Sequence, residues 1–419
     1  MGSGPVVVLV VAAGAAWESP ALQLLHTRPD VVVLKRCVDV DDLLATAAAG
    51  QAEVAVTALD AHGLDQGAVE HLRRHGVRPV AIVPTKVAPE QAHLRATRIG
   101  LDALVPESRL ESLAEAVLAA ARAAAPPAPL LSVLGEEPAS SPRGRVTVVW
   151  GAAGAPGRTT VAGAIAAELA RRQTATVLID ADPYGGAVAQ QLGILDEVSG
   201  LLAAARLASA GSLTEAVSST LRQLSAHLQV VTGLPRAERW VEVRPGALEE
   251  LVAALAERGR VVVDTGFSLE ADLAAELSGR PGRNDLTISA LGAADDVLVV
   301  GTPDPVGIAR LARGLVELEE LGVPGSVRVV VNRMRPTLGW SEADVLSMVQ
   351  GFGRPVGLHV LPEDRPGVDR ALVAGRTLVE SPDSSLARAI SSVVDALAPE
   401  TAGAAGRIRP RRAGRARRR

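Results

Sequence analysis

Short runs of valine, isoleucine and leucine recur along this chain, and each is followed by a stretch with the apolar spacing of a helix. Five such pairs occupy residues 5–122, and a second series occupies residues 146–398. Runs without polar alternation are typical of strands that helices cover on both faces, as in parallel sheets. The sequence therefore predicts an α/β protein with two doubly wound parallel sheets.

Four segments of different composition divide the 419 residues. The two strand–helix series lie in residues 1–124 and 146–399. Residues 125–145 are rich in proline and have no periodicity, which is typical of an interdomain linker. Residues 400–419 are rich in arginine. We therefore expect two domains joined by a linker and followed by a flexible tail.

The distribution of cysteine and charge narrows the expected location and partners. A single cysteine, Cys37, excludes an intramolecular disulfide, and no apolar run reaches the roughly 18 residues of a membrane span. We expect a cytoplasmic protein, either free or peripheral at the inner face of the cell membrane. The last thirteen residues hold eight arginines and no acid. This tail could bind anionic membrane or DNA, or it could only keep the protein soluble.

The stretch WGAAGAPGRTT, residues 150–160, lies between a predicted strand and a predicted helix, where a phosphate-binding loop would lie. It departs from the motif G-x-x-x-x-G-K-[ST], because Ala152 replaces the first glycine and Arg158 replaces the lysine. The backbone of such a loop and the following helix N-terminus still form an anion nest. A glycine–proline turn with no ligand is the alternative. The loop residues predicted to bind nucleotide are Gly154, Ala155, Pro156, Gly157, Arg158, Thr159 and Thr160.

Polar side chains stand where later strands end. Asp180 and Asp182 close the run VLIDAD, Asp264 closes RVVVD, and Asn332 follows VVV. Ligands of doubly wound sheets bind at the carboxyl ends of the strands, so we expect these groups near the loop. Thr159 could offer an oxygen to Mg²⁺, and the Asn332 amide could pair with a base edge.

In this order the stretches resemble the MinD/ParA superfamily of deviant P-loop ATPases, and most of all its CpaE/TadZ branch, in which a receiver-like domain precedes the ATPase. The matching stretches are GAPGRTT, LIDADPYGG, VVVDTGF, VLVVGTPDPVGIARL, VVVNR and LPEDRPGVDRALVAGRTLVE, and they cover most of residues 146–398. The resemblance implies ATP and Mg²⁺ as cofactors. It implies Thr159, Asp180 and Asp264 for the metal, Asp182 for the attacking water, Arg158 for the β- and γ-phosphates, and Asn332 and Pro362 for adenine.

Two departures from the family loop K-G-G-x-G-K-[ST] bear on catalysis. The first lysine of the family crosses a dimer interface to the phosphates of the partner, and Ala153 stands at this position here. The second lysine is Arg158, whose planar guanidinium is bulkier than an ammonium group. We therefore expect hydrolysis to be slow or absent, so that the protein is a weak ATPase at most.

Residues 1–124 resemble a response-regulator receiver, which is flavodoxin-like, but the residues that accept phosphate in receivers are missing. Ala12, Ala13 and Gly14 stand where a receiver has its acidic pair, after the first strand. Ala58 stands at the aspartate position that ends the third strand, and Val105 and Pro106 stand at the lysine position that ends the fifth. Asp60 lies two residues from the aspartate position and has no acidic pair beside it. We expect a pseudo-receiver that docks or dimerises.

Taken with the resemblance, these features favour a nucleotide-dependent positioning factor. Such a protein would place a cell-envelope machine, such as a pilus or secretion assembly, or the division site. Its partners would be nucleotide, a second copy in an ATP-linked homodimer, and envelope-assembly or division proteins. Two alternatives are a DNA-partitioning ATPase that uses the arginine-rich tail, and a scaffold of the same fold that binds no nucleotide.

Overall fold

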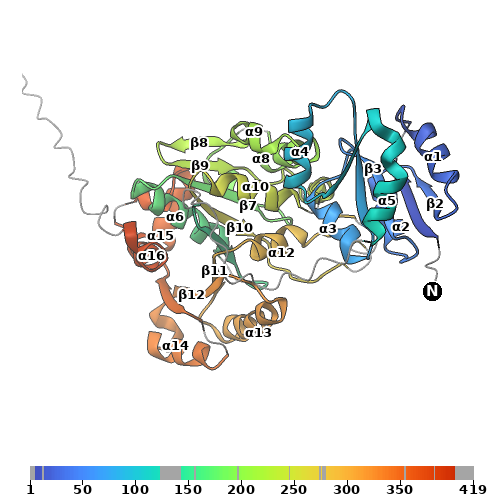
Figure 1. The fold of residues 1–419 in the computed structure, drawn as a ribbon. Helices are drawn as coiled ribbons and strands as arrows, with labels where there is room; N and C mark the ends of the chain where they lie inside the picture. The colour runs from blue at the N-terminus through green and yellow to red at the C-terminus, as the bar shows by residue number, and fades with distance from the viewer. Residues whose placement is uncertain are drawn as a thin grey trace, which may run out of the picture.

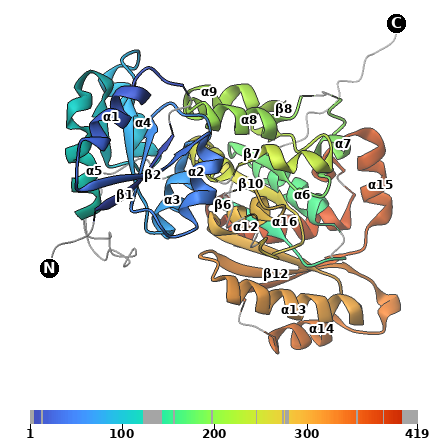
Figure 2. The same cartoon turned by 90° about the vertical axis from the view of Figure 1, so that its right-hand side faces the viewer.

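The computed structural model describes residues 5–11, 14–122, 143–154, 157–195, 198–244, 246–272, 275, 280–352, 355–381 and 383–401. These residues form two units, each built on one sheet with helices on both faces (Figures 1 and 2). The α/β fold predicted for both halves of the chain is confirmed. Most of the predicted linker, and the tail beyond Thr401, lie outside the described residues.

The N-terminal unit has a five-stranded parallel sheet in the order β2-β1-β3-β4-β5, which is the flavodoxin-like order. Helices α1 and α5 cover one face, and α2, α3 and α4 cover the other. The elements are β1 (Val6–Val11), α1 (Glu18–His26), β2 (Val31–Cys37), α2 (Val40–Ala47), β3 (Val54–Ala58), α3 (Gln66–Arg74), β4 (Arg78–Val83), α4 (Pro89–Arg98), β5 (Ala103–Pro106) and α5 (Leu113–Arg122), with the 3₁₀ helix η1 (Glu107–Ser112) before α5.

The receiver positions of this unit lie at the carboxyl ends of its strands. Ala58 is the last residue of β3, and Ala12 and Ala13 lie outside the described residues. Asp60 forms an ion pair with Lys86, with 2.8 Å between carboxylate oxygen and Nζ. The pseudo-receiver role itself stays a prediction.

The C-terminal unit has an eight-stranded sheet in the order β13-β12-β11-β6-β10-β7-β9-β8. Its strands are β6 (Val146–Trp150), β7 (Thr176–Ala181), β8 (Arg222–Ser225), β9 (Leu228–Val231), β10 (Arg260–Thr265), β11 (Asp296–Gly301), β12 (Ser326–Met334) and β13 (Gly357–Pro362). Its α-helices are α6 (Arg158–Arg171), α7 (Val188–Gln191), α8 (Gly200–Ser209), α9 (Leu213–Ala216), α10 (Ala247–Ala256), α12 (Asp285–Gly292), α13 (Pro305–Leu321), α14 (Glu342–Gln350), α15 (Arg365–Ala374) and α16 (Ser385–Leu397). Short 3₁₀ helices are η2 (Val217–Thr220), η3 (Ala237–Glu242), η4 (Pro336–Leu338) and η5 (Leu378–Glu380).

One strand of this sheet differs from the expectation of a parallel sheet. β8 pairs with β9 in the antiparallel sense, so the sheet is mixed. β8 has the sequence RQLS and is largely exposed beyond its first residue, and it joins β9 through a tight turn at the sheet edge. A short polar run of this kind has no apolar periodicity, which is why the sequence did not predict it.

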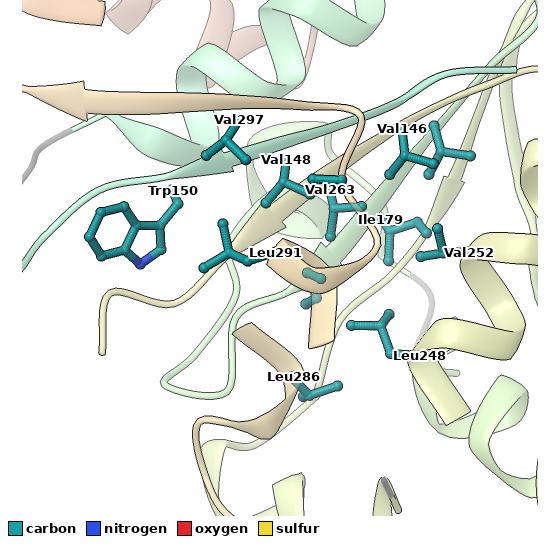
Figure 3. Close-up of a cluster of buried hydrophobic side chains, with 14 of the residues drawn as sticks. Val146, Val148, Trp150, Ile179, Leu248, Val252, Val263, Leu286, Leu291 and Val297 are labelled. Atoms are coloured by element: carbon teal, nitrogen blue, oxygen red, sulfur yellow. The ribbon is translucent and has the colours of Figure 1, made fainter. Parts of the chain in front are cut away.

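Strand β6 lies in the middle of the sheet, between β10 and β11, and all five of its residues are buried. α6 and α16 pack on one face of the sheet, and α8, α10, α12 and α13 pack on the other. Figure 3 shows part of the second layer, a buried cluster that includes Val146 and Val148 of β6, Leu248 of α10 and Leu291 of α12. The loop after β6 therefore starts from a strand that is buried along its whole length.

A buried ion-pair network joins α6 to α16. The Arg172 side chain is fully buried, and its Nε donates to Glu168 Oε1 at 2.8 Å. Its Nη1 donates to Asp395 Oδ1 at 2.7 Å, and its Nη2 donates to the Ser391 carbonyl oxygen at 2.9 Å. Burial acts to raise the pKa of Glu168, but hydrogen bonds from Arg171 and Arg172 hold it below its ordinary value. This network fixes the helix that follows the loop.

Polar contacts connect the two units. The guanidinium of Arg244 donates to both carboxylate oxygens of Asp41, at 2.6 and 3.1 Å. Arg95 on α4 donates to the carbonyl oxygens of Leu59, in its own unit, and Ala210, in the other. Within the described part of the chain, no helix is both long and apolar enough to span a bilayer.

We predict that Arg172→Met lowers the free energy of unfolding by about 1.5–3 kcal/mol, because the buried Glu168 loses a charged hydrogen bond while it keeps those from Arg171 and Ser391. Arg171→Met is the matched control. It removes a partner of Glu168 that is 35% exposed, and should cost about 1 kcal/mol or less. Urea denaturation of both variants measures the difference, and equal losses would contradict this account.

Candidate functional site

The loop between β6 and α6 ends in an uncapped helix N-terminus. Gly157 is the N-cap residue, with φ of 99°, and no side chain caps the helix. Thr159 and Thr160 lie in the first helical turn and are half-buried, while Ala155 and Pro156 lie outside the described residues. The free N–H groups of a first turn carry the positive end of the helix dipole. This turn can therefore bind an anion, and its threonine hydroxyls stand beside it.

Arg158 is turned toward the sheet and has several partners there. Its Nε donates to the carbonyl oxygen of Thr265 at 3.2 Å, and its Nη1 donates to that of Gly151 at 3.1 Å. Its Nη2 lies 3.8 Å from Oδ2 of Asp182. The guanidinium thus bridges the carboxyl ends of β6 and β10 and the segment after β7. A lysine could occupy only part of this set, because it lacks the planar fork.

Asp264, at the end of β10, is fully buried, and neither of its carboxylate oxygens has a hydrogen bond of regular geometry. Burial raises its pKa well above the ordinary value, and repulsion from Asp180 adds to the effect. The Thr159 hydroxyl and Arg158 act in the opposite direction. A buried carboxylate without regular partners is costly unless a cation or proton compensates for it.

Asp180, on β7, organises the loop that carries Asp182. Its two carboxylate oxygens accept hydrogen bonds from the backbone N–H groups of Asp182 at 3.3 Å and Val188 at 3.1 Å. A side chain at Gly186 or Gly233 would overlap this carboxylate, so both positions require glycine. Burial raises the pKa of Asp180 to about 7. Its role as a magnesium ligand stays a prediction, and in this structure its oxygens hold the loop.

Two of the residues predicted to bind magnesium, Thr159 and Asp264, offer the oxygen ligands that this ion takes. The unsatisfied oxygens of Asp264 lie beside Thr159, and Mg²⁺ takes hydroxyl and carboxylate oxygens. Among the described residues, no three acidic, histidine or cysteine side chains form a complete metal site. Mg²⁺ usually retains water and takes the remaining ligands from phosphate. An ion here would therefore be held jointly by Thr159, Asp264 and a bound nucleotide.

A cavity of about 250 Å³ brings the predicted base-binding residues together with the loop. It is lined by Gly157, Thr160, Asn332 and Pro362, among others. A side chain at Gly157 would overlap the Asn332 amide, so the end of β12 lies directly against the start of α6. The structure thus places these four residues around one space, next to the helix N-terminus.

Four aromatic and polar residues near Asp182 were not predicted from the sequence. The rings of Tyr184 and Phe267 have centroids 4.6 Å apart, and the Arg283 guanidinium lies 4.2 Å from the centre of the Tyr184 ring. The Tyr184 hydroxyl donates to Oδ1 of Asn284 at 2.7 Å. These contacts join the loop after β7 to the start of α12. The one sequence feature that could have indicated these contacts is the tyrosine in DPYGG, because it is the single tyrosine of the chain.

No protein-family model and no curated protein matches this sequence. Among solved structures, the cell division ATPase MinD of Pyrococcus furiosus is 19% identical, with 61% of this chain and 98% of that chain covered and a TM-score of 0.49. The septum site-determining protein MinD of Pyrococcus horikoshii, complexed with Mg-ADP, is 18% identical, with 63% and 99% covered and a TM-score of 0.49. A ParA family ATPase of Chlorobium tepidum is 18% identical, with 61% and 98% covered and a TM-score of 0.49. These structural neighbours are MinD/ParA ATPases. Likeness of this size does not assign a function, which has to be argued from the site.

We predict that Asp264→Asn stabilises the nucleotide-free protein at pH 8 by roughly 1–3 kcal/mol. The raised pKa means that the folded state binds more protons than the unfolded state above about pH 4, so the contribution of Asp264 to stability falls as the pH rises. The amide has the same shape and no charge. The advantage of the variant should therefore shrink toward pH 5.

Urea denaturation at pH 5 and pH 8, without Mg²⁺ or nucleotide, measures this difference. Asp383→Asn, at an exposed position, is the control and should change stability little at either pH. A stability difference between Asp264→Asn and the unmodified protein that does not vary with pH would contradict the explanation.

Proposed function

We propose that the C-terminal unit binds ATP together with Mg²⁺. The proposal rests on one observation: the uncapped turn of α6, the unsatisfied carboxylate of Asp264 and the cavity of Asn332 and Pro362 meet at one edge of the sheet. An anion site, a site that attracts a cation and a pocket of base size are the three parts that a magnesium nucleotide needs.

Each part of the site would have a separate task. The N–H groups of the first turn of α6 would bind phosphate oxygens, and Thr159 with Asp264 would hold the metal. A bound Mg²⁺ would neutralise charge on the phosphates. Asp182 would orient a water molecule. Its carboxylate already accepts a hydrogen bond from the Tyr184 N–H at 2.8 Å, which fixes its orientation.

We further propose that nucleotide binding acts as a switch in a positioning factor of the MinD/ParA type, with the CpaE/TadZ branch as the finer assignment. ATP would favour a homodimer, and slow hydrolysis would time its release. The unit at residues 1–124 would dock onto a partner in envelope assembly or division. The direct contact between Arg244 and Asp41 offers a path by which the nucleotide state could reach that unit.

We predict that millimolar Mg-ATP raises the melting temperature of the protein, because a ligand that binds only the folded state stabilises it. Thr159→Ala should abolish the shift, because it removes the hydroxyl beside Asp264. Thr214→Ala, at an exposed position on α9, is the matched control and should retain it. Calorimetric titration provides the second measurement. Absence of binding by both methods would leave the scaffold interpretation.

We predict a turnover well below the median of about 10 per second for enzymes. The donors of Arg158 are engaged with two carbonyl oxygens and Asp182, and Ala153 carries no charge. The double variant Ala153→Lys, Arg158→Lys should raise the rate of phosphate release at saturating Mg-ATP. A rate near the enzyme median for the unmodified protein would refute the argument.

A further inference from the structure

A second cavity, of about 290 Å³, also borders the loop and is lined by three arginines. Its lining includes Gly154 of the loop, Arg310 of α13, and Arg333 and Arg335 at the end of β12. Asp304 is the acidic residue of this lining, and its carboxylate accepts a hydrogen bond from the Gly307 N–H at 3.0 Å as the N-cap of α13. Three cations therefore face one carboxylate that already has a partner.

Arg310 lies directly against the loop. A side chain at Gly154 would have to displace its guanidinium, and Gly154 has φ of 74°, a conformation that favours glycine. The Arg310 side chain is exposed, and within the described part of the chain it makes no hydrogen bond and no ion pair. An exposed arginine that lies against the loop, and whose donors no described residue occupies, can donate hydrogen bonds to an anion bound there.

Arg333 connects the two cavities, because it lines both this one and the cavity of Asn332 and Pro362. Its backbone has φ of 63°, a conformation that is uncommon for residues other than glycine. Its carbonyl oxygen accepts a hydrogen bond from Nη1 of Arg335 at 3.3 Å. The arginine cavity and the proposed base site thus share a lining residue, and each borders the loop.

We propose that Arg310, assisted by Arg333, binds the terminal phosphate of a nucleoside triphosphate from within the same chain. This inference rests on the proposed function. A guanidinium can donate two parallel hydrogen bonds to one phosphate group. A nucleoside diphosphate has no third phosphate group at the distance from the loop where Arg310 would bind it. The site then distinguishes ATP from ADP without a partner subunit.

The test compares affinities for Mg-ADP and for the magnesium complex of a non-hydrolysable ATP analogue by calorimetric titration. Arg310→Gln should weaken binding of the analogue by about ten- to a hundredfold and binding of ADP by less than about threefold, since a charged hydrogen bond is lost only with the triphosphate. Arg310→Lys should keep part of the preference. Arg313→Gln, an exposed position on the same helix, is the matched control and should change neither affinity.

Three outcomes would overturn the inference. If Arg310→Gln leaves the ratio of the two affinities unchanged while the unmodified protein binds both nucleotides, Arg310 has no such role and the proposed function stands. If the preference of the unmodified protein for the analogue disappears on tenfold dilution, the charge comes from a partner subunit. If the unmodified protein binds neither nucleotide, the proposed function fails together with the inference. The melting temperature of each nucleotide-free variant shows that it is folded.

Discussion

Burial of the central strands on both faces is the constraint on which the C-terminal unit depends. β6, β7 and β10 are buried along their whole lengths, so a polar group that must reach a ligand can do so only where a strand ends. All the strands of this sheet except β8 run parallel, and their carboxyl ends therefore meet at one edge. This geometry collects Asp180, Asp264 and Asn332 next to the loop. The site follows from how the sheet is covered, before any ligand is considered.

The same burial makes the site destabilise the fold when no ligand is bound. Asp180 and Asp264 repel each other in a region from which water is excluded, and both have raised pKa values. Asp180 offsets part of its cost through two backbone N–H groups, whereas Asp264 has no hydrogen bond of regular geometry. A structural role alone does not explain that second carboxylate, because an asparagine would fit there without the charge. Its cost is explained if a cation occupies the site during function.

The fold was largely predictable because the apolar runs of a parallel sheet are long, contiguous and free of charge. Strand β8 was not predicted because its polar sequence has no apolar period and forms a strand only by pairing with β9. For the site, residues at strand ends such as Asp264 and Asn332 could be anticipated, since position along a strand determines the edge at which they lie. Arg310 could not, because it stands in mid-helix, where a solvated arginine is the ordinary case. Only the packing of α13 against Gly154 brings it to the loop.

Replacing a lysine by arginine in this loop alters more than one charge. A lysine has a single ammonium group, which can bind either the loop carbonyl oxygens or a phosphate. The guanidinium of Arg158 binds carbonyl oxygens at the ends of both β6 and β10. The substitution therefore makes position 158 part of the support of the sheet edge. Positive charge toward a ligand would then come from elsewhere, and Arg310 and Arg333 line one cavity together with Gly154. If the proposed site binds a nucleotide, support of the sheet edge and recognition of phosphate are divided between arginines on different elements.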